Sequence, residues 1–176
     1  KNKIKKNILS KIKNKKIVKV DDTFINKYLD SRNLKQNRKN SLNANLINKI
    51  DHYIWWFSTK RQSYYLQRNG KIRIFFSQEL VNFKTRIFWV GGWFNSENKC
   101  TALDIMEALK WQLNYSKKIY NCLWIVLIKK TNKIVFKINR YLGYKIISKN
   151  KDNVLYQALK DFYNIKKKKN YYFLKK

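Results

Sequence analysis

Few side chains in this sequence have the types and spacing needed for acid–base or metal chemistry. His52 is the only histidine, so a Ser-His-Asp arrangement would have to use it. The closest carboxylate pairs are Asp21–Asp22 and Asp104–Glu107, whereas a two-metal nuclease needs several converging carboxylates. Asp104 and Glu107 also stand where they complement the N-terminus of a predicted helix. We therefore expect no catalytic residue, no metal site and no cofactor.

Cys100 and Cys122 are the only cysteines. Their separation fits no zinc-binding spacing, and free thiols in a basic chain are typical of a reducing compartment. Because free cysteine is among the most often buried residue types, we interpret both as packing residues.

The start of a predicted helix offers a different chemistry, anion binding. The loop Phe94–Thr101 leads into an amphipathic segment whose apolar residues recur at helical spacing. Thr101, followed three residues later by Asp104, is a variant of the capping box that begins helices. Lys99 and the free backbone N–H groups of this helix start would bind a phosphate.

The charge balance indicates a polyanionic partner. The 176 residues include 41 Lys and Arg against 10 Asp and Glu, a formal net charge of +31. Nucleic acid is the obvious candidate, because each neutralised phosphate releases condensed counterions. With 44% hydrophobic and 16% aromatic residues, the chain is too apolar for a disordered basic tail. We therefore expect a folded protein that binds nucleic acid.

The composition also bears on the origin of the chain. Proline is absent, glycine numbers 4, and Lys, Asn and Ile recur throughout. Codon bias in an AT-rich genome explains this pattern, which favours a mitochondrion, with another AT-rich organelle or the cytoplasm of an AT-rich organism as alternatives. No signal peptide or membrane-spanning segment is visible, and the lysines are too dispersed for a membrane-surface helix.

The periodicity predicts an α/β fold. We expect a mixed sheet in which an antiparallel hairpin is followed by helix–strand–helix–strand crossovers, with basic terminal extensions. Asn69–Gly70 supplies the positive φ that a tight hairpin needs, and Gly143 ends a helix. The expected strands are Tyr53–Ser58, Ser63–Gln67, Lys71–Phe76, Arg86–Val90, Cys122–Ile128 and Tyr144–Ser148, and the expected helices follow Thr101 and span Asn132–Leu142 and Asn153–Tyr163.

The chain divides into three parts on this basis. Residues 1–50 are expected to form a basic helical or irregular N-terminal extension, which begins with a lysine-rich arm over Lys1–Val20. Residues 51–150 form the α/β core, with an insertion at about 77–90. Residues 151–176 contribute a C-terminal helix and a lysine-rich tail.

Three motifs in this core resemble the small-subunit ribosomal protein S11 family, the platform protein, as a divergent organellar member. Phe94 is followed, after four residues, by Lys99-Cys100-Thr101, where the family has Lys-Ser-Thr at the start of a helix. Gly143-Tyr144-Lys145-Ile146 stands where the family has a Gly-Phe-Arg-Ile-like step, and the turn Arg68-Asn69-Gly70 also ends in glycine. The resemblance covers roughly Tyr53–Val154, apart from the inserted residues 77–90 and a shortened loop at Lys129–Lys133.

This resemblance implies a non-catalytic, structural constituent of the small-subunit platform in mitochondrial ribosomes. Its partners would be ribosomal RNA and neighbouring ribosomal proteins, with no membrane and no small-molecule substrate. A large-subunit protein similar to ribosomal protein L18 and a nucleic-acid-processing enzyme are the alternatives. Basic side chains would neutralise phosphates, and neighbouring aromatic rings would stack on bases. The residues expected to contact RNA are Lys60, Arg61, Gln62, Arg68, Lys84, Arg86, Lys99, Thr101, Lys129, Lys130, Lys133, Lys137, Arg140, Lys145, Lys167 and Lys168.

Overall fold

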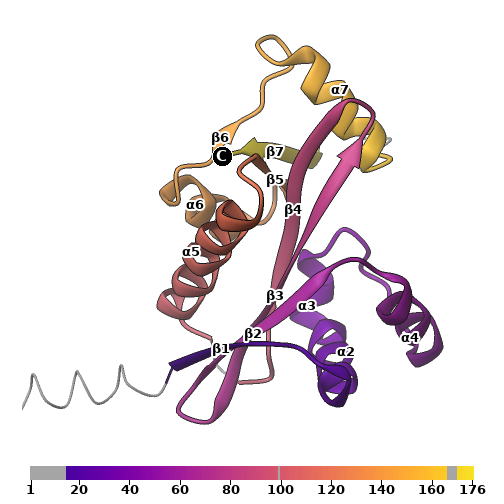
Figure 1. Cartoon of the computed structure of the whole chain (residues 1–176), viewed down its shortest axis with the longest axis vertical. Coiled ribbons are helices and arrows are strands. Elements are labelled where there is room, and N and C mark those ends of the chain that lie inside the picture. Colours follow the sequence, from indigo (N-terminus) through magenta and orange to yellow (C-terminus); the bar gives the residue numbers. More distant parts are fainter. Residues whose placement is uncertain (1–14, 99, 166–169) are drawn as a thin grey trace, which may run out of the picture.

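One mixed β-sheet organises the chain (Figure 1). The computed structural model describes residues 15–98, 100–165 and 170–176. Within these ranges the sheet has seven strands in the order β1-β2-β3-β4-β5-β7-β6. The strands are β1 (Lys15–Lys19), β2 (Gln62–Arg68), β3 (Lys71–Phe83), β4 (Arg86–Asn95), β5 (Leu123–Lys129), β6 (Lys145–Ile146) and β7 (Tyr171–Lys175). The helices are η1 (Asp22–Phe24), α2 (Ile25–Asn33), α3 (Lys35–Asn40), α4 (Lys49–Ser58), α5 (Ala102–Ile119), α6 (Lys133–Tyr141) and α7 (Asn153–Phe162).

The strand directions confirm the predicted α/β class with a mixed sheet. Strands β1 to β4 pair antiparallel, β4 and β5 pair parallel, and β7 lies antiparallel between β5 and β6. Helix α5 makes the crossover that a parallel pair requires. The β2–β3 turn has Asn69 and Gly70 at φ +51° and +72°, as the Asn-Gly pair predicts.

Three segments take roles that the sequence does not predict. Residues 171–175, expected in the lysine-rich tail, form β7 between β5 and β6. Residues 15–19, expected in a basic arm, form β1 and pair with β2. Residues 77–90, marked as an insertion, form much of the far half of the β3–β4 hairpin, where Ser77 pairs with Gly92 and Phe83 with Arg86. The second strand of this hairpin, β4, lies in the middle of the sheet (Figure 1).

The expected strand at Tyr53–Ser58 is wrong, because these residues lie in helix α4. Asn48 caps this helix by accepting a hydrogen bond from the backbone N–H of Asp51. At helical spacing, His52, Trp55 and Trp56 reach the same neighbour, Tyr28 of α2. Aromatic residues favour strands on average, but here their packing on α2 decides the outcome.

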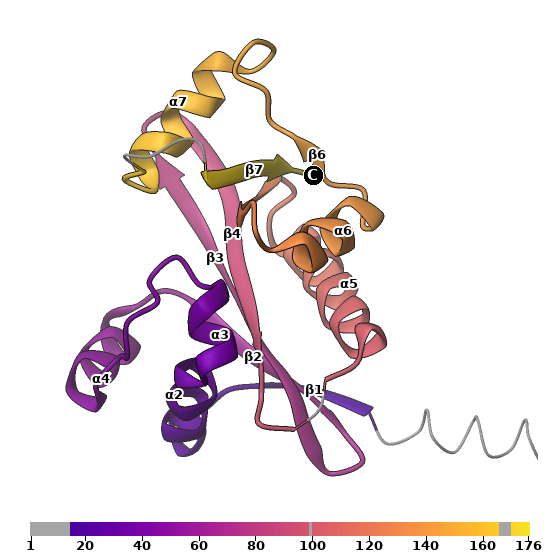
Figure 2. The same ribbon diagram turned by 180° about the vertical axis from the view of Figure 1, so that it is seen from behind.

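Helices cover both faces of the sheet (Figure 2). On one face, called the α5 face below, α5 and α6 cover apolar side chains such as Leu66, Ile74 and Phe76. On the opposite face, Phe75 packs with Tyr28 near α2 and α4. Farther along the same face, α7 contributes a separate apolar cluster on the other half of β3 and β4. The opposite face is therefore covered by two groups of helices.

Strands β4 and β5 diverge after a short parallel ladder. Only Phe88–Val90 pairs with Leu123–Ile125, while β4 continues to Asn95 and β5 to Lys129. Gly91 lies where the strands part, and a Cβ there would collide with the main-chain oxygen of Ser77 and lie 2.9 Å from the Trp124 ring. This point of the sheet has no room for a side chain.

We expect Gly91→Ala to destabilise the fold by about 2 kcal/mol, because its methyl group must displace a backbone atom and a buried indole. Gly92→Ala is the matched control, since a Cβ at Gly92 meets no atom within 4 Å. That change should stay within about 0.5 kcal/mol of the wild type. Urea unfolding followed by circular dichroism measures both. Equal stabilities for the two variants would contradict this account of the branch point.

Candidate functional site

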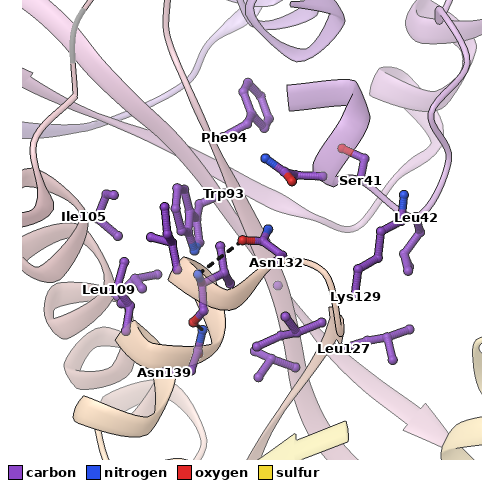
Figure 3. A pocket seen from close by; sticks show the side chains of 18 of the residues that line it. Ser41, Leu42, Trp93, Phe94, Ile105, Leu109, Leu127, Lys129, Asn132 and Asn139 are labelled. Carbon is purple, nitrogen blue, oxygen red and sulfur yellow. Dashed lines mark hydrogen bonds between the residues drawn. The ribbon is translucent and has the colours of Figure 1, made fainter. Parts of the chain in front are cut away.

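A cavity of about 850 Å³ opens where β4 and β5 part (Figure 3). Its walls come from both strands, from α5 and α6 on the α5 face, and from α3 and the end of α7 on the opposite face. Figure 3 shows Trp93, Ile105 and Leu109 on one side of this cleft, and Ser41 and Lys129 on the other. The cleft is therefore lined from both faces of the sheet, and its end on each face is called a mouth below.

Backbone polar groups line the gap between the two strands. The side-chain amide of Asn37 donates to the oxygen of Asn95 at 2.7 Å and accepts from its N–H at 3.2 Å, in place of a neighbouring strand. Because backbone groups alternate in direction along a strand, the N–H and C=O of Trp93 point to the same edge of β4 as those of Asn95. The backbone groups of Trp124 in β5 and of Lys130 just after it bond to Lys176 and Asn170, which flank β7. By the same alternation, the backbone N–H and C=O of Leu127 face β4. An extended polar chain could thus bond to both edges, as in strand addition.

Two helices begin beside the mouth on the α5 face. Thr101 caps α5 in the capping box that its spacing predicts, and Ala102, the first residue of the helix, lines the cleft. Asn132 caps α6 by accepting from the N–H of Val135, and both residues line the cleft. The first N–H groups of a helix lack intrahelical partners and carry partial positive charge. This mouth therefore suits an anionic group.

Asp104 ties the start of α5 to the β2–β3 hairpin. Its carboxylate is almost fully buried and accepts from Arg68 Nε at 2.8 Å, while Arg68 also pairs with Glu107 at 2.6 Å. Burial acts to raise the pKa of Asp104, but hydrogen bonds from Thr101 and Arg68 outweigh it and lower that pKa. The charge of Asp104 is thus neutralised inside the protein.

The mouth on the opposite face combines polar side chains with the apolar Leu42 and Phe162. The polar residues that line it are Gln36, Asn40, Ser41, Arg61, Lys129 and Tyr163. Lys129 Nζ donates to the oxygen of Lys39 at 3.2 Å, and Arg61 contacts Glu79 at 3.4 Å. Burial raises the pKa of the Tyr163 hydroxyl, an effect that Arg61 opposes and Glu79 reinforces, so this hydroxyl stays protonated at neutral pH.

Hydrogen bonds fix the walls between the two mouths. Gln112 of α5 donates to the oxygen of Ser77 at 2.8 Å, and the Trp124 indole donates to Ser116 Oγ at 2.6 Å. One buried polar atom in the described residues of the cleft, Asn95 Oδ1, has no hydrogen-bond partner. Such an atom is an acceptor for an N–H group of a bound molecule.

The described wall of the cleft contains no carboxylate and one thiol, that of Cys100. Burial raises the pKa of Cys100 to about 12, with a further rise from Asp104 and a smaller opposing effect of Arg73. The thiol therefore stays protonated at neutral pH and is a poor nucleophile. His52 lies outside this wall, buried against Tyr28, and burial lowers its pKa. The residues described form no cluster of His, Cys, Asp and Glu suited to a metal ion.

The structure scatters the residues that the sequence selects for RNA contact. Arg61 and Lys129 line the cleft, and Thr101 caps α5 beside it. Arg68 is bound to Asp104, and Lys84 to Asp161. Lys60, Gln62, Arg86, Lys130, Lys133, Lys137, Arg140 and Lys145 are distributed over β2, β4, β6, α6 and the segments beside them. Lys99, Lys167 and Lys168 lie outside the described residues.

The sequence reasoning missed most of the cleft. The expected strand Arg86–Val90 ends before Gly91-Gly92, whereas β4 continues through both glycines to Asn95 and leaves β5 at Gly91. Nothing local distinguishes Asn37 from other asparagines, because its partner Asn95 is far along the chain. No helix in the described ranges is both long and apolar enough to span a membrane.

Comparison with known proteins identifies the fold. No protein-family model and no curated protein matches this chain. Ribosomal-protein-alanine N-acetyltransferase from Brucella melitensis superposes with a TM-score of 0.68 at 11% identity, covering 92% of this chain and 98% of that one. A putative acetyltransferase from Salmonella typhimurium, solved with acetyl-CoA, gives 0.66 at 8% identity and 92% of both chains. An acetyltransferase of the GNAT family from Streptococcus pneumoniae gives 0.65 at 10%, covering 92% and 98%.

The chain therefore has the GNAT-like fold, and the resemblance to the S11 family is wrong. The motifs behind that resemblance describe a hairpin, a capped helix and a glycine-ended helix, which both folds contain. These motifs carry no information on the edge strand β1 or on the position of β7 between β5 and β6. The predicted ribosomal function is therefore wrong as well. So are the assignment to the small-subunit platform, the large-subunit alternative, and the predicted partners, ribosomal RNA and ribosomal proteins. The nucleic-acid-processing enzyme has no support either.

Two expected absences are overturned by the same finding. The chain was expected not to be an enzyme and to have no small-molecule substrate. The three structural neighbours named above are acetyltransferases, one of them putative, and that one was solved with acetyl-CoA. The basic charge misled because it describes the surface, whereas the cleft is built from apolar and neutral polar side chains with few charges.

We expect Arg68→Gln to destabilise the protein by about 3 kcal/mol, because the buried Asp104 carboxylate then lacks its ion pair. Since the folded pKa of Asp104 is lowered, its contribution is present above about pH 4 and lost as the pH falls through the folded pKa. In the variant this loss should begin at a higher pH. Urea midpoints between pH 7 and pH 3 measure both effects. Lys84→Gln, which removes an exposed ion pair, is the control expected to match the wild type.

Proposed function

We propose that this protein is an acetyl-CoA-dependent N-acetyltransferase. The cleft between β4 and β5 carries this proposal, because it gives one molecule access from each face of the sheet. A transferase that moves an acyl group directly between two substrates needs such a passage, with the donor entering from one side and the acceptor from the other. The GNAT-like fold supports the choice of donor and of reaction.

The residues present fit acetyl-CoA at the mouth on the α5 face. Its pantetheine arm is an extended chain with two amides, and the edges of β4 and β5 at Trp93 and Leu127 offer backbone groups of the matching kind. Asn95 Oδ1, buried without a partner, is a further acceptor for an amide N–H. Ile105 and Val135 provide apolar surface for the methylene groups.

The phosphates of the cofactor fit the helix starts at the same mouth. The N–H groups of Ala102 and Leu103, the first two of α5, have no partner within the helix. The segment Ser96–Thr101 contains no glycine and therefore forms no glycine-rich phosphate-binding loop. The phosphates would instead be bound by the N-terminus of α5, by Asn132 at the start of α6 and by the positive charge of the chain.

When bound, acetyl-CoA supplies an acyl group already activated as a thioester. The protein's own residues then position the acceptor amine and exclude water. The described residues of the wall include no carboxylate to act as a base. The cations Arg61 and Lys129 lower the pKa of a bound ammonium group, so the amine binds in its neutral, nucleophilic form. The protonated Cys100 argues for direct transfer to the amine rather than a cysteinyl intermediate.

The proposal is tested with acetyl-CoA and a change at the cleft mouth. Ile134 lines the cleft, is 71% exposed and is the second residue of α6, where a carboxylate suits the helix dipole. We expect Ile134→Glu to weaken acetyl-CoA binding about tenfold by charge repulsion, with little effect on stability. Isothermal titration calorimetry of wild type and variant measures the affinity.

Val154→Glu is the matched control. Val154 is 70% exposed and is also the second residue of its helix, α7, but it lies outside the cleft wall. Its substitution adds the same charge and should leave the affinity unchanged. Absence of acetyl-CoA binding by the wild type at millimolar concentration, or equal weakening by both substitutions, would overturn the proposal.

A further inference from the structure

We infer that the acceptor is an amine whose molecule also carries an anionic group, a carboxylate or a phosphate, and that Arg61 recognises this anion. This inference rests on the proposed function and concerns the second mouth of the same cleft. The acceptor would enter on the face opposite α5 and α6, where the lining includes polar side chains, among them Arg61 and Lys129.

The acceptor mouth lies between the two groups of helices on that face. Phe94 belongs to the cluster with α2 and α4, whereas Val90 belongs to the cluster with α7. Gly92 stands between them on the same face, and the space above its Cα is open, since a Cβ would meet nothing within 4 Å. A small molecule can therefore reach the β4 edge at this point.

The charges at this mouth favour an anion. Arg61 and Lys129 line it, and no Asp or Glu belongs to the described cleft wall. The carboxylate of Glu79 contacts Arg61 through a single oxygen, at 3.4 Å from both Nε and Nη2. These long contacts leave Nη1 of Arg61 without a partner among the described residues, and a third of the side chain is exposed. A guanidinium in this state can bind a second carboxylate or a phosphate.

The rest of the surface offers little to a polycationic acceptor. All ten acidic residues lie in the described part of the chain. Most of them already hold a cation, a helix N-terminus or a polar side chain; these are Asp21, Asp22, Asp51, Glu79, Glu97, Asp104, Glu107, Asp152 and Asp161. A polyamine or a lysine-rich peptide would thus approach a chain of net charge +31 without a free acidic cluster to bind it.

The same mouth suits the amine end of the acceptor. Gln36, Asn40, Ser41 and Tyr163 provide neutral oxygen atoms that accept hydrogen bonds from a neutral amine. The neighbouring cations disfavour a protonated amine, so the amine itself brings no electrostatic attraction. The anionic group of the same molecule supplies that attraction. Arg61 is therefore a specificity-determining residue in this account, and it does not contact the reacting atoms.

The test compares acceptors in pairs that differ by one anionic group. L-alanine is set against L-alaninamide, and glucosamine 6-phosphate against glucosamine, with spermidine as the polycation. CoA release and the acetylated product are measured by liquid chromatography and mass spectrometry. In at least one pair, kcat/KM should be about tenfold or more higher for the anionic member. The pair that responds distinguishes a carboxylate from a phosphate acceptor.

Variants then assign the preference to Arg61. Arg61→Gln should remove the preference, mainly through KM, while Arg61→Lys keeps part of it because the charge is retained. Glu79→Gln should strengthen it, because it frees the guanidinium from its partner. Lys60→Gln is the control: it removes one charge from the neighbouring residue, which lies outside the cleft wall, and should change nothing. A merely structural role for Arg61 would not produce opposite effects at Arg61 and Glu79.

The outcomes separate this inference from the proposed function. If acetyl-CoA does not bind, both fall. If acetyl-CoA binds but spermidine or the uncharged amines are preferred, or no anionic acceptor is acetylated, only the inference about the acceptor is overturned. A preference for the anionic member that survives Arg61→Gln overturns the role of Arg61.

Discussion

The separation of β4 from β5 is the constraint on which the rest of the structure depends. A parallel ladder of three residue pairs holds the strands together, and beyond Val90 and Ile125 each strand continues without the other. Gly91 permits this, because the main chain there lies against Ser77 and the Trp124 indole without room for a side chain. The unpaired backbone edges must then find other partners, and Asn37 provides one at Asn95.

Charge is distributed so that the cleft keeps few fixed ions. Arg68 neutralises Asp104 within the protein, so the start of α5 holds its capping carboxylate without presenting a net negative charge to the cleft. On the other face, the weak contact between Arg61 and Glu79 leaves a positive group accessible. The large net charge of the chain is thus a property of its exposed surface, while the chemistry of the site depends on neutral polar groups and a few cations.

Features set by neighbouring residues could be predicted from the sequence. The Asn69–Gly70 turn, the Thr101–Asp104 capping box, and the helix that follows Asn132 and ends before Gly143 are all confirmed. Each depends on hydrogen bonds or dihedral angles within a few residues. The helix at Tyr53–Ser58 was mistaken for a strand, because its aromatic residues are explained only by their packing on Tyr28.

The sequence by itself determined the α/β class, the local starts and ends of several elements, and the strongly basic character of the chain. Only the tertiary structure decided the strand order, with β1 at one edge and β7 between β5 and β6, and hence the GNAT-like fold. It also decided the cleft, whose walls join residues as distant as Asn37, Asn95 and Tyr163. Strand order and cavities arise from contacts between residues far apart in the chain, and periodicity and capping patterns carry no record of such contacts.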